Sequence, residues 1–174
     1  CVRLIGNNYG GINLEDIKDP ECFLIEERLK EELEVPVFHD DQHGTAIITT
    51  AGFINALHLT DRNYSDAKIV VNGAGASAIA CVELIKSVGV PNENVIMCDS
   101  RGVIYRGRED GMNQWKSAHA VDTDARDLAE ALIGADVFIG LSKKDVVSRH
   151  MIQSMADKPI IFAMANPDPE ITPE

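Results

Sequence analysis

Two pairs of adjacent carboxylates are the residues in this chain most suited to binding a cation. Glu15-Asp16 and Asp40-Asp41 each lie where a loop is expected to meet a regular element. Hard divalent cations such as Mg²⁺ and Mn²⁺ take about six oxygen ligands in an octahedral arrangement. Three carboxylates would leave positions free for a substrate that chelates through two oxygens. Spacing alone leaves open the alternative that both pairs are helix caps or solvated surface.

A second set of residues matches the pattern G-x-G-x-x-G/A: Gly73-Ala74-Gly75-Ala76-Ser77-Ala78. The segment follows a β-branched run and opens an expected helix, and Asp99 ends the next expected strand. In this context Gly73 permits a tight turn and Gly75 lets backbone N–H groups approach a pyrophosphate, which the helix N-terminus would bind. The small Ala78 lets helix and strand pack closely. The sequence predicts a dinucleotide site, with a plain turn of a βαβ unit as the alternative.

The residues after the second strand leave the choice of dinucleotide open. Asp99 would accept hydrogen bonds from the adenosine ribose hydroxyls, which favours NAD, and would repel a 2′-phosphate. Arg101 could instead bind that phosphate, and Ser100 could donate to it. Both NAD and NADP are therefore retained as candidate cofactors.

Two histidines flank the second acidic pair. His39 and His43 could belong to a transition-metal site, but their arrangement favours a plainer function in which one or both hold the loop by hydrogen bonds.

The elements expected to position these residues alternate between strands and helices. Strands are predicted at 37–38, 69–71, 95–98, 137–139 and 160–162. Helices are predicted over 22–33, 44–59, 76–88, 128–133 and 148–155, with a short one inside an irregular stretch at 107–120. Asp19-Pro20 is expected to cap and open the first helix, and Asp124 or Asp127 to cap a later one. Residues 1–15 read as a loop, and the apolar 44–59 helix reads as buried on all sides.

Alternation of this kind predicts an α/β fold, a doubly wound, Rossmann-type, mostly parallel sheet with helices on both faces. Residues 1–60 would form the metal-ligand segment at the junction with a preceding domain. Residues 61–174 would form the dinucleotide-binding domain, and the two parts would make one compact unit.

Composition excludes several classes of function. The net charge of −12 argues against nucleic acid and against an anionic membrane surface, because both require clustered Lys and Arg. No apolar stretch is long enough to span a bilayer. The four cysteines show no C-x-x-C or zinc-like spacing, and nothing in the sequence resembles a signal peptide, so we expect a reduced protein in the cytoplasm.

Four blocks of sequence, in their order along the chain, resemble those of malic enzymes, especially the large bacterial ones that usually prefer NADP. The first two resemble the metal-binding blocks, the third the dinucleotide loop and the last the family's Asn-Pro block. They are Gly10-Gly11-Ile12-Asn13-Leu14-Glu15-Asp16-Ile17, Val37-Phe38-His39-Asp40-Asp41-Gln42-His43-Gly44-Thr45-Ala46, Val71-Asn72-Gly73-Ala74-Gly75-Ala76 and Phe162-Ala163-Met164-Ala165-Asn166-Pro167.

The resemblance implies specific site residues. Glu15, Asp16 and Asp41 would be the ligands of Mg²⁺ or Mn²⁺, and Asp40 would stand behind them, orienting a ligand or relaying a proton. Asn166 would lie by the substrate and the nicotinamide ribose. Without the resemblance, Asn166 would read as a turn residue before a proline.

The resemblance also implies the reaction, the oxidative decarboxylation of malate to pyruvate and CO₂ with reduction of NAD(P), by a homo-oligomer. The family's catalytic tyrosine and lysine precede the first block, and Tyr9 and Lys18 do not occupy matching positions. We therefore expect this chain to be a fragment that binds nucleotide but turns over little or no malate alone.

Two other functions share the dinucleotide loop. An amino-acid dehydrogenase-like nucleotide domain would have no use for the acidic pairs, and a non-catalytic NAD(P)-binding module would show no response to malate or metal. Replacing Asp41 by Ala would separate a malic enzyme from the dehydrogenase, and a thermal-shift titration of cofactor, Mn²⁺ and malate would identify the non-catalytic module.

Overall fold

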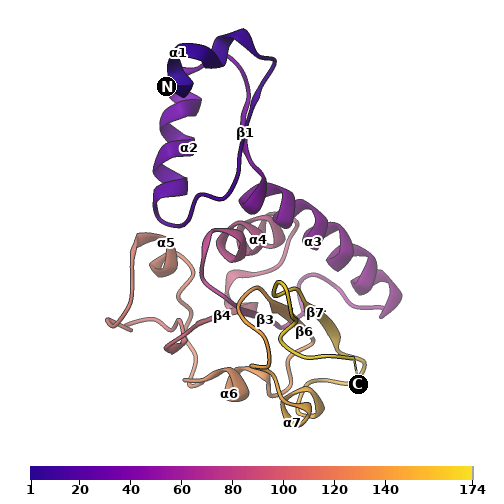
Figure 1. Ribbon diagram of the computed structural model, residues 1–174. Coiled ribbons are helices and arrows are strands. Elements are labelled where there is room, and N and C mark those ends of the chain that lie inside the picture. The colour runs from indigo at the N-terminus through magenta and orange to yellow at the C-terminus, as the bar shows by residue number, and fades with distance from the viewer. Residues whose placement is uncertain (174) are drawn as a thin grey trace.

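A computed structural model describes residues 1–173 of the chain (Figure 1). Its helices are α1 (Val2–Ile5), α2 (Glu21–Glu32), α3 (Asp40–Leu59), α4 (Ala76–Ser87), α5 (Gln114–Ser117), α6 (Leu128–Leu132) and α7 (Arg149–Gln153), with 3-10 turns η1 (Gly6–Asn8) and η2 (Asn92–Asn94). Its strands are β1 (Ile12–Leu14), β2 (Val37–His39), β3 (Ile69–Asn72), β4 (Val95–Asp99), β5 (Gly102–Val103), β6 (Val137–Gly140) and β7 (Ile160–Ala163). None of these helices is long and apolar enough to cross a membrane.

The main sheet has the strand order β5-β4-β3-β6-β7. Strands β3, β4, β6 and β7 are parallel, and only the two-residue β5 runs antiparallel, against β4. From β3 the chain passes through α4 to β4 on one side, whereas β6 and β7 lie on the other side. The strand order therefore reverses at β3 and β6, the place where open α/β sheets bind their ligands.

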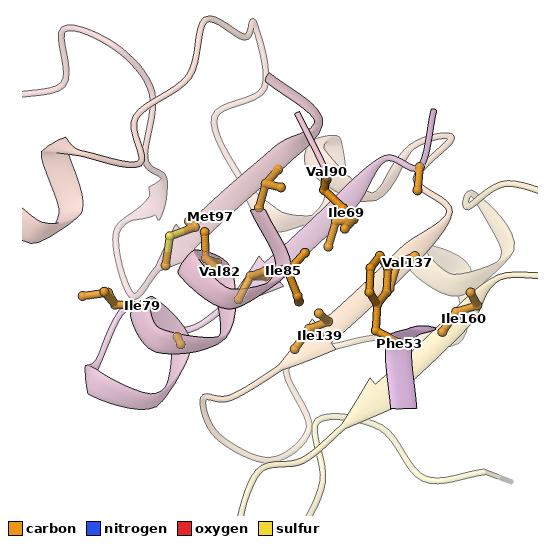
Figure 2. Packing of buried hydrophobic residues seen from close by; sticks show 14 of the residues in the cluster. Phe53, Ile69, Ile79, Val82, Ile85, Val90, Met97, Val137, Ile139 and Ile160 are labelled. Carbon is orange, nitrogen blue, oxygen red and sulfur yellow. The ribbon is translucent and has the colours of Figure 1, made fainter. Parts of the chain in front are cut away.

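Helices cover both faces of this sheet, as predicted. On one face, Phe53 and Leu57 of α3 and residues of α4 pack against the alternate side chains Ile69 and Val71 of β3 (Figure 2). On the opposite face, Leu132 of α6 packs with the intervening Val70. The β-branched strands are buried on both sides because each neighbouring residue points into a different core.

The first 39 residues form a smaller unit, here called the lobe, that extends from the sheet in Figure 1. In the lobe, β1 pairs in parallel with β2, so that Leu14 lies opposite His39. A core of its own joins Leu14, Leu29, Leu33 and Val37. The short strand β1 lies in the stretch expected to be a loop, and this expectation was wrong.

Two other local predictions were wrong. Pro20, not Asp19, is the N-terminal cap residue of α2, and no side chain caps that helix. Helix α3 begins at Asp40, four residues earlier than predicted, and is not buried on all sides, since Ile48 is 70% exposed. A helix in the single layer above a sheet has only one face to bury. Of the two candidate caps for α6, Asp127 accepts a hydrogen bond from Glu130 N.

Helix α3 connects the lobe to the sheet. It follows directly from β2 and packs extensively along α4, and its Phe53 is fully buried in the sheet's core. The domain boundary predicted near residue 60 stays a prediction, but α3 already belongs to the layer that covers the sheet.

A nucleotide cavity beside two acidic pairs

The loop between β3 and α4 has the geometry expected of a phosphate-binding turn. Gly73 has φ +136°, and a Cβ there would lie 2.5 Å from the carbonyl oxygen of Leu141. Only glycine fits a left-handed turn with another backbone this close. Gly75 is the N-terminal cap residue of the twelve-residue α4 and offers no side chain to its free N–H groups. Ala78 is fully buried where α4 meets the sheet.

A cavity of about 660 Å³ opens at the carboxyl ends of the strands, at the point where the strand order reverses. It is lined by the ends of three strands and the loops that follow them: residues 72–75 after β3, 99–100 after β4 and 141–143 after β6. Of the predicted cofactor residues, Gly73, Ala74, Gly75 and Asp99 line it. Ala76 and Ser77 form the first turn of α4 beside it.

Asp99 does not present a free carboxylate to this cavity. Nη2 of Arg108 donates to both of its oxygens, at 2.8 and 2.7 Å, and Nζ of Lys116 donates to Oδ2 at 2.8 Å. Burial alone would raise the pKa of Asp99, but the hydrogen bonds from Lys116 and Arg108 hold that pKa below its ordinary value. Two cations thus bind one carboxylate at the tip of β4.

The residues next to Asp99 differ in their placement. Ser100 lines the cavity, but the Arg101 guanidinium is half-exposed, pairs with Asp110 and is not among the lining side chains. Lys116 does line the cavity. The structure thus supplies a different cation beside the adenosine position from the one that the sequence suggested.

The two acidic pairs follow adjacent parallel strands and so reach the same edge. Asp41 Oδ2 accepts a hydrogen bond of 2.8 Å from the backbone N–H of Asp16, which joins the turn after β1 to the first turn of α3. The carboxylate of Glu15 accepts from Nδ2 of Asn13 at 2.7 Å, and that of Asp40 lies over Gly44.

These carboxylates suit a hard cation in chemical type, and their backbones are brought together. In residues 1–173, however, no three carboxylate, histidine or cysteine side chains are gathered closely enough to hold one ion. Glu15 and Asp16 are exposed and would have to turn toward Asp41. The predicted ligand set therefore stays a prediction.

The two histidines beside the second pair have different environments. Nε2 of His43 lies 2.7 Å from Oε1 of the buried Glu26, which also accepts from Lys30 and Gln42. This hydrogen bond ties α2 to the first turn of α3, as the loop-holding function requires. His39 is fully buried, and neither of its ring nitrogens has a partner among the described residues, so it does not hold the loop in this way.

Asn166 lies on the exposed loop after β7, at the same edge of the sheet as the cavity. It is not among the side chains that line the cavity. Its assignment to the substrate and the nicotinamide ribose stays a prediction.

Sequence reasoning missed two side chains that line the cavity, Lys116 and Asp19, and also Arg108, which pairs with Asp99. Arg108 and Lys116 come from the stretch that read as an irregular surface excursion, and no spacing rule connects them to Asp99. Asp19 lies at the start of α2 in the lobe, yet it lines the cavity, and its Oδ1 lies 3.4 Å from where a Cβ of Gly75 would be. Only the folded chain shows these contacts.

Comparison with known proteins agrees with this geometry. Residues 42–174 match the family model described as malic enzyme, NAD binding domain. The chain is 68% identical to an NADP-dependent malic enzyme of Rhizobium meliloti over 174 residues, covering all of this chain and 23% of that protein. It is 54% identical to an NADP-dependent malic enzyme of Halomonas elongata, covering 99% of this chain and 41% of that protein.

Solved structures show the same fold. An NAD-dependent malic enzyme from Thermotoga maritima superposes with a TM-score of 0.92 at 42% identity, covering 99% of this chain and 46% of that one. The chain thus spans less than half the length of these relatives. Since the family model, the sequence relatives and the fold agree, the chain belongs to the malic enzyme family and carries its NAD-binding domain.

Proposed function

We propose that the full-length protein that carries this chain catalyses the divalent-metal-dependent oxidative decarboxylation of malate to pyruvate and CO₂, with NADP as the preferred oxidant. Two features support the proposal: the nucleotide cavity and the acidic pairs near it. Asp19, three residues after Asp16, lines that cavity. A cation held near Asp16 would therefore lie close to the nucleotide.

The observation that carries the proposal is the hydrogen bond from Asp16 N to Asp41 Oδ2. It joins two acidic pairs that are 25 residues apart in sequence and that a plain dinucleotide-binding domain does not need. Glu15, Asp16 and Asp41 would hold the ion, and Asp40 would orient one of these ligands. Asn166, on the loop after β7, would approach the substrate from the opposite side.

The division of chemistry follows from these placements. A bound divalent cation supplies Lewis acidity, which stabilises negative charge on the C2 oxygen as CO₂ leaves. The nucleotide supplies the hydride acceptor. The chain's own residues would hold the two groups: the loop after β3 would bind the pyrophosphate, and the carboxylates would hold the ion to which the substrate binds.

The preference for NADP is proposed from the surroundings of Asp99. The relatives' names include both NADP-dependent and NAD-dependent malic enzymes, so similarity alone does not decide. Arg108 pairs with Asp99, and Lys116, whose Nζ also binds Asp99, lines the cavity. A 2′-phosphate would meet the Lys116 ammonium there, and the carboxylate of Asp99 is already paired with two cations.

We also propose a cytoplasmic location and a homo-oligomer. The location is supported by four free cysteines, three of them buried, with no disulfide among them. The assembly is supported by the resemblance to the family.

The proposal is tested by Asp41→Asn in the full-length protein, with the exposed Asp66→Asn as a matched control. Loss of a metal ligand should lower Mn²⁺-dependent malate oxidation by about a hundredfold or more, while the affinity for NADP stays near that of the wild type. A variant that kept its metal-dependent turnover would contradict the assignment. Malate oxidation that needs no metal would favour a metal-independent dehydrogenase, and NADP binding without any turnover of malate would favour a non-catalytic nucleotide-binding module.

A further inference from the structure

A buried carboxylate lies next to the nucleotide cavity and has no assigned function. Glu170 is 0% exposed, and no lysine, arginine or histidine in residues 1–173 forms an ion pair with it. Its Oε1 accepts from Ser142 N at 2.9 Å and from Ser142 Oγ at 3.1 Å, and its Oε2 accepts from Ala165 N at 3.0 Å. Burying a carboxylate is costly, so a residue that stays buried on neutral donors alone is strongly constrained by them.

The direction of the hydrogen bonds is fixed along this network. Nδ2 of the buried Asn72 donates to Ser142 Oγ at 2.8 Å, so the hydroxyl proton of Ser142 is free to point at Glu170. Asn72 ends β3, Ser142 follows β6 and Ala165 follows β7. This series of hydrogen bonds, from Asn72 through Ser142 and Glu170 to Ala165, therefore crosses the carboxyl ends of three neighbouring strands.

The last residue of β6 is adapted to this network. A Cβ on Gly140 would overlap the Glu170 carboxylate. The strand ends on a residue without a side chain at the place where the carboxylate must reach Ser142 N. Glycine is required there because a side chain would not fit. The backbone conformation does not require it, because the φ of Gly140 is not in the left-handed region.

The position of the network relates it to one half of the dinucleotide. Asp99 and Lys116 lie beyond β3 on the β4 side of the cavity, where the adenosine ribose is expected. Asn72 and Ser142 line the same cavity toward β6. A dinucleotide that crosses the switch point with its adenosine half at Asp99 must place its nicotinamide half on the Ser142 side.

We infer that Glu170 is a positioning residue for the nicotinamide half of the cofactor. It joins Ser142, on the loop after β6 that lines the cavity, to Ala165 on the loop after β7, so that the second loop holds the first in place. This inference rests on nucleotide binding in this cavity and is independent of the metal site. Binding of NADP by the wild-type protein, measured first, tests that premise by itself.

The test compares two ligands on the full-length protein by isothermal titration calorimetry. One is NADP, and the other is 2′-phospho-ADP, which contains the adenosine half and lacks nicotinamide riboside. Glu170→Gln replaces one acceptor oxygen by an amide that cannot accept from a backbone N–H. It should weaken NADP roughly tenfold, as expected for the loss of one charge-assisted hydrogen bond, and leave 2′-phospho-ADP within about twofold.

Two further variants keep the test conclusive if the Glu170→Gln variant does not fold. Gly140→Ala keeps the Glu170 charge but displaces it, and Ser142→Ala removes only the bridging hydroxyl; both should shift the ratio of the two affinities in the same direction. Glu26→Gln is the matched control, because it alters another buried carboxylate that lies between α2 and α3. The ratio should stay at the wild-type value in this control. An equal loss of both ligands, or an unchanged ratio in folded variants, would overturn the inference.

Discussion

At the scale of single residues, the proposed preference for NADP depends on the groups that surround Asp99. An acidic residue at the end of the second strand usually indicates NAD, because it binds the ribose hydroxyls. Here Arg108 occupies both of its oxygens and Lys116 adds a second cation. The identity of one residue is therefore a poor guide when its partners are contributed by a distant stretch of chain.

Replacing Lys116 by Gln should weaken the binding of NADP by about ten- to a hundredfold and change the affinity for NAD by less than about threefold. Only NADP has a 2′-phosphate, so only NADP would lose a contact with the lysine. Fluorescence or calorimetric titration with both nucleotides measures this. Lys158→Gln, on an exposed turn, removes the same charge elsewhere and should change neither affinity. Equal weakening of both nucleotides by Lys116→Gln would show that the lysine contacts a group that they share.

Much of the site was predictable because local sequence determines it. The turn after β3 needs a glycine at φ +136°, and the pattern that starts at Gly73 states this directly. Arg108, Lys116, Ser142 and Glu170 were not predictable, because their partners are set by the tertiary fold. Hydrogen bonds between residues from different loops leave no period in the sequence.

At the scale of elements, the start of α2 and the loop before α4 meet at the phosphate position. Asp19 places a carboxylate near Gly75, where the helix α4 offers free N–H groups. The aromatic ring of Phe23 in α2 also stacks on Trp115 of α5, with ring centroids 4.8 Å apart. The lobe therefore contributes Asp19 to the nucleotide cavity and also packs on α5, whose Lys116 lines that cavity.

The carboxylate of Asp19 should oppose the pyrophosphate of either nucleotide. Asp19→Asn is expected to tighten NADP and NAD alike, by roughly threefold to tenfold, with a smaller dependence on salt. Glu21→Gln removes the same charge two residues away, outside the cavity, and serves as the control. Weaker binding by Asp19→Asn would mean that the carboxylate accepts a hydrogen bond from the cofactor.

The surroundings of His119 make the stability of the fold depend on pH. Burial is the main cause that lowers the pKa of His119 from 6.5 to about 4, and the charge of Lys86 is the second cause. The pKa of His119 is lower in the folded state than in the unfolded state. The contribution of His119 to stability is therefore fully present above pH 6.5 and is lost as the pH falls toward 4. The full effect amounts to about 3 kcal/mol.

The neutral substitution His119→Gln should flatten this dependence. Urea unfolding of the chain between pH 7 and pH 4 compares the two proteins, and the wild type should lose more stability across that range. Parallel curves would show that His119 is already neutral in the unfolded chain or already charged in the folded one.

At the scale of the whole molecule, the fold class followed from the sequence more reliably than the burial of individual helices. Continuous β-branched runs such as Ile69–Val71 predict strands covered on both faces, and the sheet has this arrangement. The apolar α3 misled, because its composition does not tell which face meets α4. Short strands such as β1 and β5 were missed because two or three residues establish no periodicity.

Because α3 is buried on one face only, substitutions on its two faces should differ in their effect on stability. Phe53→Ala should destabilise the chain by about 3–5 kcal/mol, because it leaves a cavity between α3 and the sheet. Ile48→Ala on the exposed face should cost less than about 1 kcal/mol. Denaturant unfolding of both variants measures the difference, and similar losses would indicate that α3 is packed differently.

The first turn of α3 has one more consequence. Asp40 and Asp41 lie at the positive end of the backbone dipole of a helix of 20 residues, which favours negative charge there without any bound ion. Their mutual repulsion is thus offset by the peptide groups behind them. The protein should therefore fold and keep this pair in place without a metal, and under the proposed metal-dependent reaction, scarcity of the ion would leave an intact but idle molecule.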